Sequence, residues 1–242
     1  MKKFVLLLLV VVVLLSGCGV SKVGSPIDAA KFKKEYESLN GKTTEDKTIR
    51  TVNIPEENPM IYKKAKDIVK MMSRQKSFVV YFGFAECPWC RSIIENLISV
   101  SQEYGINKIY YVDIKDIRDT VKVTPLVGAE TVKEGTEDYY ALVDRLKDVL
   151  EDYTLEGENG ETVITGLKRI YAPNIVVVVK GEPVAMTKGY PPTFEDPYME
   201  LDDEFKNYSK MLIGEAFEKI STKKKESKES LEEAVCTDKE SC

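Results

Sequence analysis

The amino-acid sequence predicts an α/β fold, and three consecutive segments carry that prediction. Residues 77–84 form an apolar run typical of a central strand that is buried on both faces. Residues 88–104 place most of their apolar side chains on one face of a helix, and residues 108–114 have the pattern of another strand. Because strands joined through a helix are nearly always parallel with a right-handed crossover, these segments predict a βαβ unit.

The segment before this unit carries two helical patterns and one strand pattern. Residues 27–39 have apolar side chains at helical spacing, and Asn40-Gly41 ends the expected helix. Residues 48–54 alternate as a strand does. Residues 58–75 are expected to form a helix whose apolar face consists of Ile61, Ala65, Ile68 and Met72.

The segment after the unit, residues 121–168, contains two readable elements. One helix is expected at residues 137–150. One hairpin is expected at residues 153–165, because Asn159-Gly160 at its centre is a strong hairpin signal. The remainder of this segment has no clear periodicity.

The C-terminal part of the chain returns to a strand pattern and then ends in a helix and a tail. Residues 174–180 form the second strongly apolar strand, and Gly181-Glu182 turns the chain into a further strand at 183–188. A last amphipathic helix is expected at residues 205–220. Residues 221–242 are almost wholly charged or polar and are expected to form a solvated, flexible tail.

The composition narrows the chemistry that this fold can carry. The 242-residue chain contains five cysteines and no histidine, which excludes Ser-His-Asp and Cys-His catalysis, histidine metal ligands and histidine-based pH switches. Its formal net charge is −5 at pH 7. Because a nucleic-acid-binding protein is expected to carry a basic surface, this balance argues against nucleic acid as a main partner. No cofactor is predicted.

Residues 1–17 have the pattern of an export signal peptide. Two lysines precede twelve unbroken apolar residues at 4–15, and Ser16-Gly17 supplies the small-residue end. A helix of that length is too short to span a bilayer core of about 30 Å. A buried core helix is the alternative, but the terminal position, the leading lysines and the lack of a polar face argue against it.

Leu15-Ser16-Gly17-Cys18 resembles the lipobox of bacterial lipoproteins, in which the signal is cut before the cysteine and the thiol is diacylated. The resemblance implies that Cys18 is a lipid attachment site and that the chain is anchored at the extracytoplasmic face of the cell membrane. Two acyl chains satisfy the requirement of two signals for stable attachment. Residues 18–47 are then expected to contain the tether and the N-terminal helix.

A pair of cysteines, in Cys87-Pro88-Trp89-Cys90, lies where the apolar strand passes into the helix, and this context predicts redox chemistry. Cys87 is expected at the helix N-terminus, where unpaired N–H groups and the helix dipole favour the nucleophilic thiolate. Pro88 suits the first helical turn because it loses no hydrogen bond there. Cys90 lies one turn further along the same face, from which it can attack a mixed disulfide formed at Cys87 and release the partner.

The motif in this context resembles the thioredoxin-fold thiol–disulfide oxidoreductases, over about residues 48–220. The resemblance implies a central mixed sheet with flanking helices. In that family a cis-proline begins the strand beside the redox pair, and Ala172-Pro173 before the apolar residues 174–179 matches it. Pro173 is then expected to help the backbone of Ala172 pair with the substrate chain. A trans-proline that starts a strand is the alternative, and the redox motif favours the cis form.

The chain departs from the family in its length and in the residues between the cysteines. Pro88-Trp89 replaces the Gly-Pro of thioredoxins and resembles more closely the Pro-aromatic pair of glutaredoxins. The separation of Cys90 and Pro173 exceeds that of a minimal thioredoxin, so residues 121–168 are expected to be partly an insertion, with a helix and a hairpin before the cis-proline strand. An exported, lipobox-bearing chain with this layout is similar to the bacteriocin transport accessory proteins of Gram-positive bacteria.

A further departure concerns the proton acceptor of the redox pair. Thioredoxins carry a buried acid six residues before the first cysteine of the motif, and this chain has Tyr81 at that position. The usual proton acceptor for Cys90 is therefore in doubt. Glu86, beside Cys87, is only a weak candidate to replace it.

Two other interpretations of the Cys87–Cys90 pair use no catalysis. In the first, the pair is half of a zinc site, which needs four nitrogen or sulfur ligands, but the only further thiols of the tail are Cys236 and Cys242 and no histidine completes the set. No metal is therefore predicted. In the second, the pair is a structural disulfide, with a potential below about −300 mV, whereas catalytic pairs have potentials of about −270 to −120 mV.

Three features of the sequence leave alternatives open. Cys236 and Cys242 are either a second redox pair that exchanges electrons with Cys87 or an incidental disulfide in the tail. Trp89 is either a ring that contacts the substrate or a packed ring. The basic run 223–225 is followed at once by acidic residues and is expected to be solvated.

The sequence therefore predicts an anchored thioredoxin-like protein that exchanges disulfides with exported polypeptides that contain cysteine. Cys87 is the expected nucleophile and Cys90 the resolving thiol, and a further protein is expected as redox partner. The alternative is a non-catalytic lipoprotein of the same fold that acts as a binding or accessory module in peptide export.

Overall fold

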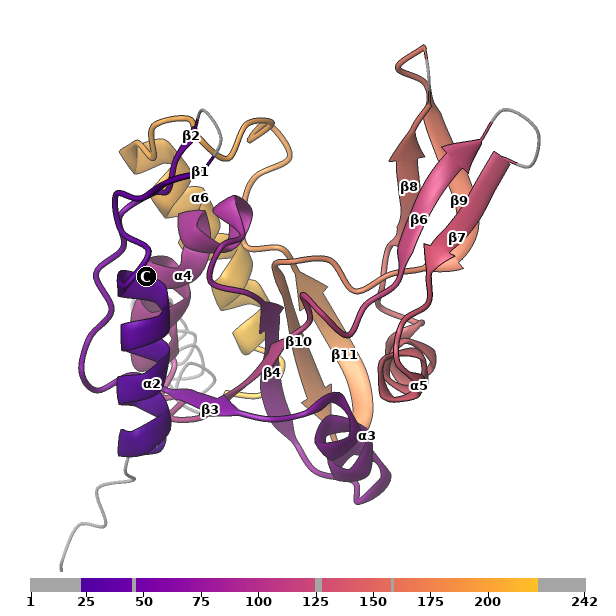
Figure 1. Ribbon diagram of the computed structural model, residues 1–242. Helices are drawn as coiled ribbons and strands as arrows, with labels where there is room; N and C mark the ends of the chain where they lie inside the picture. The colour runs from indigo at the N-terminus through magenta and orange to yellow at the C-terminus, as the bar shows by residue number, and fades with distance from the viewer. Residues whose placement is uncertain (1–22, 45–46, 125–127, 158, 222–242) are drawn as a thin grey trace, which may run out of the picture.

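The computed structural model of the protein describes residues 23–44, 47–124, 128–157 and 159–221 (Figure 1). The described chain has an α/β structure, and its largest sheet has five strands in the order β11-β10-β4-β5-β3. The sheet is mixed, because β3, β4 and β5 are parallel while β10 is antiparallel to both of its neighbours. The five strands are β3 (Met60–Tyr62), β4 (Phe78–Gly83), β5 (Ile109–Asp113), β10 (Asn174–Val179) and β11 (Glu182–Thr187).

The predicted βαβ unit is confirmed. The chain leaves β4, forms helix α4 (Pro88–Glu103) and returns as β5, which pairs in parallel with β4 so that Val79 lies opposite Ile109. All six residues of β4 are buried, as expected of a strand that is covered on both faces. On its other side β4 pairs with β10, and it is therefore the central strand of the sheet.

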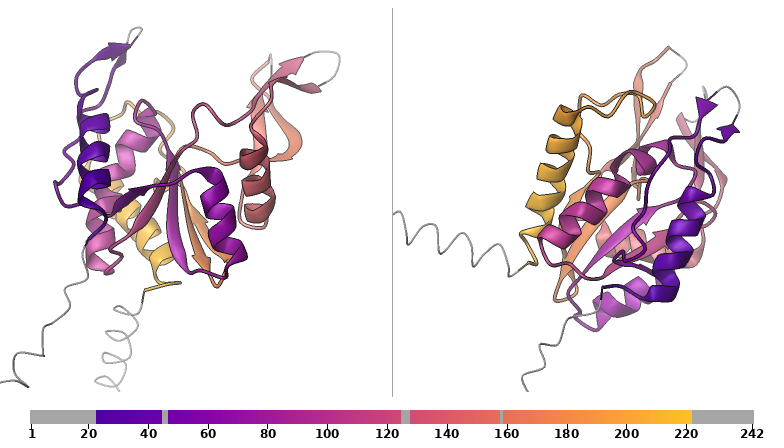
Figure 2. Two further views of the ribbon diagram at one scale, coloured as in Figure 1. Left: turned by 60° about the horizontal axis from the view of Figure 1, so that its bottom comes forward. Right: turned by 90° about the vertical axis from the view of Figure 1, so that its left-hand side faces the viewer.

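Five described helices cover the two faces of this sheet (Figures 1 and 2). Helices α2 (Pro26–Glu37), α4 and α6 (Asp203–Phe217) lie on one face, and α3 (Ala65–Ser73) and α5 (Glu137–Leu146) lie on the other. Because successive side chains of a strand point to opposite faces, Tyr81 of β4 joins the first core and Phe82 joins the second.

Residues 48–54 do not form the predicted strand. Val52 and Ile54 are buried, as the alternation of the sequence indicated. Their backbone N–H groups, however, donate to side chains rather than to a neighbouring strand: that of Val52 to Asn40 Oδ1 at 3.0 Å, and that of Ile54 to Glu37 Oε1 at 2.8 Å. The side chains of Glu37, at the end of α2, and Asn40, just beyond it, thus accept the hydrogen bonds that a neighbouring strand would accept in a sheet.

The single helix predicted at residues 58–75 is divided into β3 and α3. Ile61 lies in β3, which pairs in parallel with β5, while the other three apolar positions are buried on α3 as expected. The helix begins only after Lys64, whose backbone N–H donates to the Asp67 carboxylate at 3.2 Å. The segment before it is extended because the ladder with β5 satisfies its backbone groups.

The remaining strands form three two-stranded sheets, of which only one was predicted. The hairpin predicted at residues 153–165 is confirmed by β8 and β9, and the helix predicted at 137–150 by α5. The β6–β7 hairpin was missed because its strands bury only Val121 among polar and charged residues. These strands are β1 (Thr43–Thr44), β2 (Lys47–Thr48), β6 (Thr120–Thr124), β7 (Gly128–Lys133), β8 (Asp152–Glu156) and β9 (Thr162–Lys168).

Strands β6 to β9 stand away from the five-stranded sheet as two adjacent hairpins, which we call the hairpin arm (Figure 1). A buried ion pair lies at its base, between Arg169 and Asp119, whose side chains are 8% and 9% exposed. The Arg169 guanidinium also lies 3.9 Å from the centre of the Tyr153 ring. Asp119 directly precedes β6, Arg169 directly follows β9, and Tyr153 belongs to β8. The contacts of Arg169 therefore hold these three parts of the chain together at the base of the hairpin arm.

Several predictions concern residues outside the described part of the chain. The signal peptide at 1–17, the lipid attachment site Cys18, the basic run 223–225, and Cys236 and Cys242 of the tail all lie there. These stay predictions. Among the helices that the structure describes, none is long and apolar enough to cross a membrane.

Replacement of Asp119 by alanine is expected to lower the free energy of unfolding by about 3–5 kcal/mol, because it leaves the Arg169 cation buried without its carboxylate. Urea unfolding measures this change. The control is Asp152→Ala, which removes an ion pair with Lys168 whose partners are 39% and 59% exposed and is expected to cost about 1 kcal/mol or less. Equal losses in the two variants would contradict the assignment.

Candidate functional site

The Cys87-Pro88-Trp89-Cys90 motif lies at the junction of β4 and α4, as predicted. Cys87 is the N-cap residue of α4, and Pro88 occupies the first helical position. The Cys90 N–H donates to Cys87 Sγ at 3.2 Å, so the Cys87 side chain caps the helix. The sulfur therefore lies at the helix N-terminus, where the partial positive charge of the helix dipole is concentrated.

Both cysteines of the motif are thiols in this structure, and they differ in access. Cys87 is 3% exposed, whereas Cys90 is completely buried behind it. Cys87 is therefore the sulfur that a partner molecule can reach first, and Cys90 contacts only the interior of the protein and Cys87.

The loop before β10 meets Cys87 across the sheet. The Ala172–Pro173 peptide bond is cis, which agrees with the geometry that the resemblance implies. The Cys87 thiol donates to the Ala172 carbonyl oxygen at 3.2 Å. This contact follows from the antiparallel pairing of β10 with β4, in which Asn174 lies opposite Phe82, so that the residues before β10 lie beside the end of β4. The pairing of Ala172 with a substrate chain stays a prediction.

The surroundings of Cys87 favour its thiolate form. Burial raises the pKa of the Cys87 thiol, but hydrogen bonds from the Cys90 thiol and from the backbone N–H groups of Cys90 and Trp89, with the charge of Arg118, lower the pKa below its ordinary value. Arg118 comes from the loop after β5, and its guanidinium lies 5.2 Å from the centre of the Phe84 ring. Sequence reasoning missed Arg118, although the loops that follow adjacent parallel strands meet at one edge of a sheet.

The surroundings of Cys90 have the opposite effect. Burial raises the pKa of the Cys90 thiol well above its ordinary value, and the hydrogen bond with Cys87 and the charge of Cys87 raise it further. Hydrogen bonds to Tyr81 and to the backbone of Phe84 offset only part of this increase. The two thiols therefore differ in acidity, with the thiolate favoured at Cys87 and the protonated thiol favoured at Cys90. The roles of nucleophile and resolving thiol stay predictions.

Trp89 packs against aromatic rings that the sequence analysis did not associate with the motif. Its ring centre lies 4.9 Å from that of Tyr190 and 5.5 Å from that of Phe194. The side chain is half-buried, so a packed face and a solvent-accessible face are both present. Contact between Trp89 and a substrate stays a prediction.

Tyr81 is the residue that lies beside Cys90 in place of an acid. It is fully buried on β4, its hydroxyl and Cys90 Sγ lie side by side against Gly83, and the hydroxyl oxygen lies 3.2 Å from that of Tyr36. The weak candidate Glu86 is wrong as a proton acceptor for Cys90, because its carboxylate is at the surface and binds Lys115 at 2.6 Å. Tyr36 was missed because no spacing rule connects a residue of α2 with β4.

No group of three or more metal-ligating side chains occurs in the part of the chain that the structure describes. The zinc interpretation also involves Cys236 and Cys242, which lie outside that part. It is therefore not tested by the structure.

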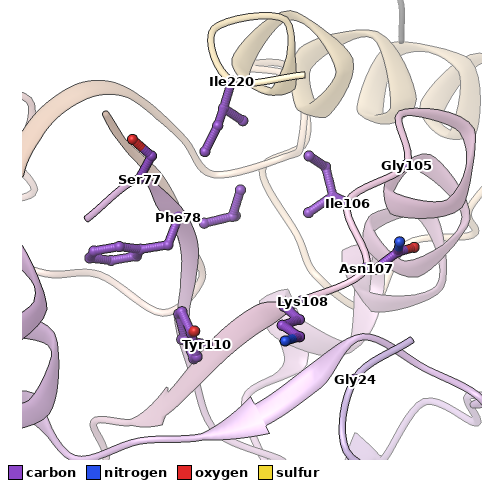
Figure 3. Close-up of a pocket in the computed structure, with 10 residues that line it drawn as sticks. Gly24, Ser77, Phe78, Gly105, Ile106, Asn107, Lys108, Tyr110 and Ile220 are labelled. Carbon is purple, nitrogen blue, oxygen red and sulfur yellow. The ribbon is translucent and has the colours of Figure 1, made fainter. Parts of the chain in front are cut away.

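A surface pocket of about 660 Å³ lies at the other end of the sheet (Figure 3). Ser77 and Phe78, at the start of β4, and Lys108 and Tyr110, at the start of β5, are among its lining residues. A strand of six residues is about 20 Å long, so this pocket is well separated from the cysteines that follow the other end of β4. The candidate site is therefore the edge of the sheet that carries the cysteines.

No family model matches the chain, and no curated protein has a detectably similar sequence. The assignment of the site therefore rests on its geometry and on the motif.

The alkylation rate of Cys87 is expected to reach half of its maximum below about pH 8.5, the ordinary pKa of a cysteine thiol, because the folded protein lowers the pKa of Cys87 and the thiolate is the reactive form. Mass spectrometry after short exposure to iodoacetamide measures the rate at each pH. The same peptide in the urea-unfolded chain is the control. A midpoint at or above that of the unfolded chain would contradict the proposed surroundings of Cys87.

Proposed function

We propose that the protein is a membrane-anchored, extracytoplasmic thiol–disulfide oxidoreductase that exchanges disulfides with exported polypeptides. The observation that carries this proposal is the position of the Cys87 sulfur. It caps the N-terminus of α4, has a lowered pKa and lies 3.2 Å from the carbonyl oxygen of Ala172 in the loop that precedes β10. A thiolate in this position faces a backbone segment on which a substrate chain can align.

The proposed reaction begins when the Cys87 thiolate attacks a substrate disulfide. A mixed disulfide forms between Cys87 and one substrate sulfur, and the other substrate sulfur leaves and takes up a proton. Cys90 then loses its proton and attacks Cys87 Sγ, so that the Cys87–Cys90 disulfide forms and the second substrate sulfur leaves as a thiol. The substrate gains two electrons from the cysteine pair and two protons, one balanced by the proton that Cys90 loses and the other taken from solvent, because Cys87 reacts as a thiolate. The reverse sequence oxidises a substrate dithiol.

A thioredoxin-like fold is part of the same proposal. It is supported by the βαβ unit, by the β10–β11 hairpin that follows a cis-proline, and by helices on both faces of the mixed sheet. On this proposal, the predicted insertion at residues 121–168 corresponds to α5 and the hairpin arm, which lie outside the five-stranded sheet.

The cellular setting rests on the sequence. The export pattern of residues 1–17 and the lipobox at Cys18 support an anchor at the extracytoplasmic face of the membrane. The similarity to bacteriocin transport accessory proteins supports a role in the export of peptides that contain cysteine. The lipid anchor, the exported polypeptide and a protein that restores the redox state of Cys87 are thus the proposed partners.

A non-catalytic binding module is the second candidate function, and the hairpin arm favours it. The arm exposes large apolar side chains on β7 and β9, namely Val132 at 50%, Ile164 at 69% and Leu167 at 47%. Exposed apolar surface of this kind is used for protein binding. In this case the chain would hold an export partner without exchanging electrons with it.

The wild-type protein is expected to reduce insulin or to oxidise a reduced, unfolded substrate. Cys87→Ser is expected to abolish this activity, because no other thiolate lies at the helix N-terminus. Cys90→Ser is expected to leave mixed disulfides at Cys87 unresolved, and mass spectrometry of the captured polypeptides identifies the substrate. The Cys236→Ser, Cys242→Ser double variant is the control, and its activity shows whether the tail pair takes part.

Absence of wild-type activity in both directions would leave the binding module as the function. A structural disulfide is tested separately, by equilibration with redox buffers. Trp89 is the only tryptophan of the chain, so its fluorescence reports directly on the neighbouring cysteines. A potential below about −300 mV would identify a structural bond rather than a catalytic one.

Cys18→Ser is expected to prevent diacylation and to release the protein from the membrane fraction, because it removes the thiol that carries the two acyl chains of the proposed anchor. Fractionation of cells that express the variant, with metabolic labelling by a fatty acid, measures both effects. Normal processing and retention of this variant at the membrane would refute the lipid anchor.

A further inference from the structure

Two buried tyrosines form a hydrogen-bonded pair behind the redox cysteines. Tyr81 comes from β4 and Tyr36 from α2, and both side chains are completely buried. Their hydroxyl oxygens lie 3.2 Å apart. Hydroxyl groups in a protein core are costly unless they form hydrogen bonds, so this pair must be satisfied locally.

The hydroxyl of Tyr81 also meets the sulfur of Cys90. Both groups lie against the backbone of Gly83, and a hydrogen bond from the Tyr81 hydroxyl lowers the pKa of the Cys90 thiol. A Cβ atom at Gly83 would lie 2.7 Å from the Tyr81 hydroxyl oxygen and 2.9 Å from Cys90 Sγ. The absence of a side chain at Gly83 therefore provides the space in which the hydroxyl and the sulfur meet.

We propose that Tyr81 is the hydrogen-bond donor that stabilises the Cys90 thiolate during disulfide exchange, and that Tyr36 is a positioning residue that orients the Tyr81 hydroxyl. This inference rests on the proposed function. Tyr81 thus takes the position of the buried acid of thioredoxins, but it is a neutral hydrogen-bond donor. It stabilises the Cys90 thiolate and does not accept the proton of Cys90.

The direction of the hydrogen bonds follows from the chemistry of the three groups. Burial, together with the neighbouring thiols and the other tyrosine, raises the pKa of Tyr36 well above its ordinary value, and burial and the Cys90 thiol do the same for Tyr81. Both phenols therefore stay protonated at neutral pH. Each hydroxyl has one proton to donate, so Tyr36 donates to Tyr81 and Tyr81 donates to Cys90 when that sulfur is ionised.

The charged and titratable groups around Cys90 leave this role to Tyr81. The groups that act most strongly on the Cys90 thiol are Cys87 of α4, Tyr81 of β4 and the backbone of Phe84, and none of them is a carboxylate. The nearby phenols of Tyr36 of α2 and Tyr190, after β11, have raised pKa values and are therefore uncharged at neutral pH.

The buried cation Arg91 lies beside Tyr36. Its guanidinium is 5.8 Å from the centre of the Tyr36 ring and donates a hydrogen bond to the Tyr36 backbone carbonyl oxygen at 3.0 Å. Arg91 therefore helps to fix the position of Tyr36, which in turn orients the Tyr81 hydroxyl.

The step that this arrangement assists is the release of the substrate. Cys90 loses its proton to solvent and attacks Cys87 Sγ in the mixed disulfide, the Cys87–Cys90 bond forms, and the bond between Cys87 and the substrate sulfur breaks. The substrate sulfur leaves with the electron pair and takes up a proton. Negative charge on Cys90 exists only before the new bond forms, so the donor acts on the approach to that step.

The reactions of the two cysteines can be followed as separate phases with an aromatic disulfide that releases a coloured thiol. Dithiobis-nitrobenzoate reacts first with Cys87 and releases one thiol, and attack by Cys90 then releases the second. The test uses the full chain with Cys18, Cys236 and Cys242 replaced by serine. Stopped-flow absorbance gives the rate of each phase.

Tyr81→Phe is expected to slow the second phase by about 10-fold to 100-fold and to leave the first unchanged, because a hydrogen bond to a charged group is lost. Tyr36→Phe is expected to slow the second phase by about 2-fold to 10-fold. The matched control is Tyr62→Phe. The rings of Tyr62 and Tyr81 both pack against Tyr111, but the hydroxyl of Tyr62 donates to Glu35, so its loss is expected to change neither phase.

The outcomes distinguish this inference from the proposed function. Release of a single thiol equivalent by the protein with Tyr81 intact would refute the exchange reaction itself. Release of two equivalents with an unchanged second phase in Tyr81→Phe would overturn only the role of Tyr81. Equal slowing of both phases would assign a structural role and overturn it as well.

A second measurement does not depend on exchange. When Cys87→Ser is added to the chain in which Cys18, Cys236 and Cys242 are already serine, Cys90 is the one remaining thiol, and thiolate absorbance in the ultraviolet follows its ionisation. Adding Tyr81→Phe is expected to shift the midpoint to higher pH, by about one unit or more, because the thiolate loses its donor. An unchanged midpoint in a folded variant would overturn the inference.

Discussion

The pairing of β4 with β5 on one side and β10 on the other is the constraint on which the site depends. Parallel pairing brings the loops after β4 and β5 to one edge, which places Arg118 near Cys87. Antiparallel pairing brings the start of β10 to the same edge, which places Ala172 against Cys87. Because both faces of β4 are buried, a shift of one residue would exchange the two cores and turn Tyr81 away from Cys90.

The site obtains its electrostatic asymmetry without histidine. Backbone N–H groups and Arg118 stabilise negative charge at Cys87, while burial opposes it at Cys90. A second cation supports the architecture: Arg91 is 2% exposed, and its guanidinium donates to oxygen atoms of four residues instead of to a carboxylate. These acceptors are the backbone carbonyls of Tyr36, Arg50 and Ala85 and the side chain of Asn40. Arg91 thus fixes α2 to the loop that leads into the redox motif.

The parts of the fold that the sequence predicted are those with strong local signals. The apolar run of β4, the helical face of α4 and the Pro173 that precedes β10 each combine a clear pattern with a conformational preference. Residues 48–54 alternate like a strand but form none, because side-chain acceptors, which give no periodic signal in the sequence, bind their backbone N–H groups. The β6–β7 hairpin lacks an apolar face, and Tyr36 reaches the site only through tertiary packing, so neither has a signal in the local sequence.

The ends of the described fold lie together at the end of the sheet opposite the cysteines. The Gly24 N–H donates to the carbonyl of Asn107, and the Ser221 hydroxyl donates to the carbonyl of Tyr104, each at 2.7 Å. Both acceptors precede the start of β5, whereas the redox motif follows the end of β4. If the chain is anchored ahead of Gly24, as we propose, its thiols face away from the bilayer. On that proposal, the length of the tether sets the distance from the lipid surface at which the thiols contact an exported polypeptide.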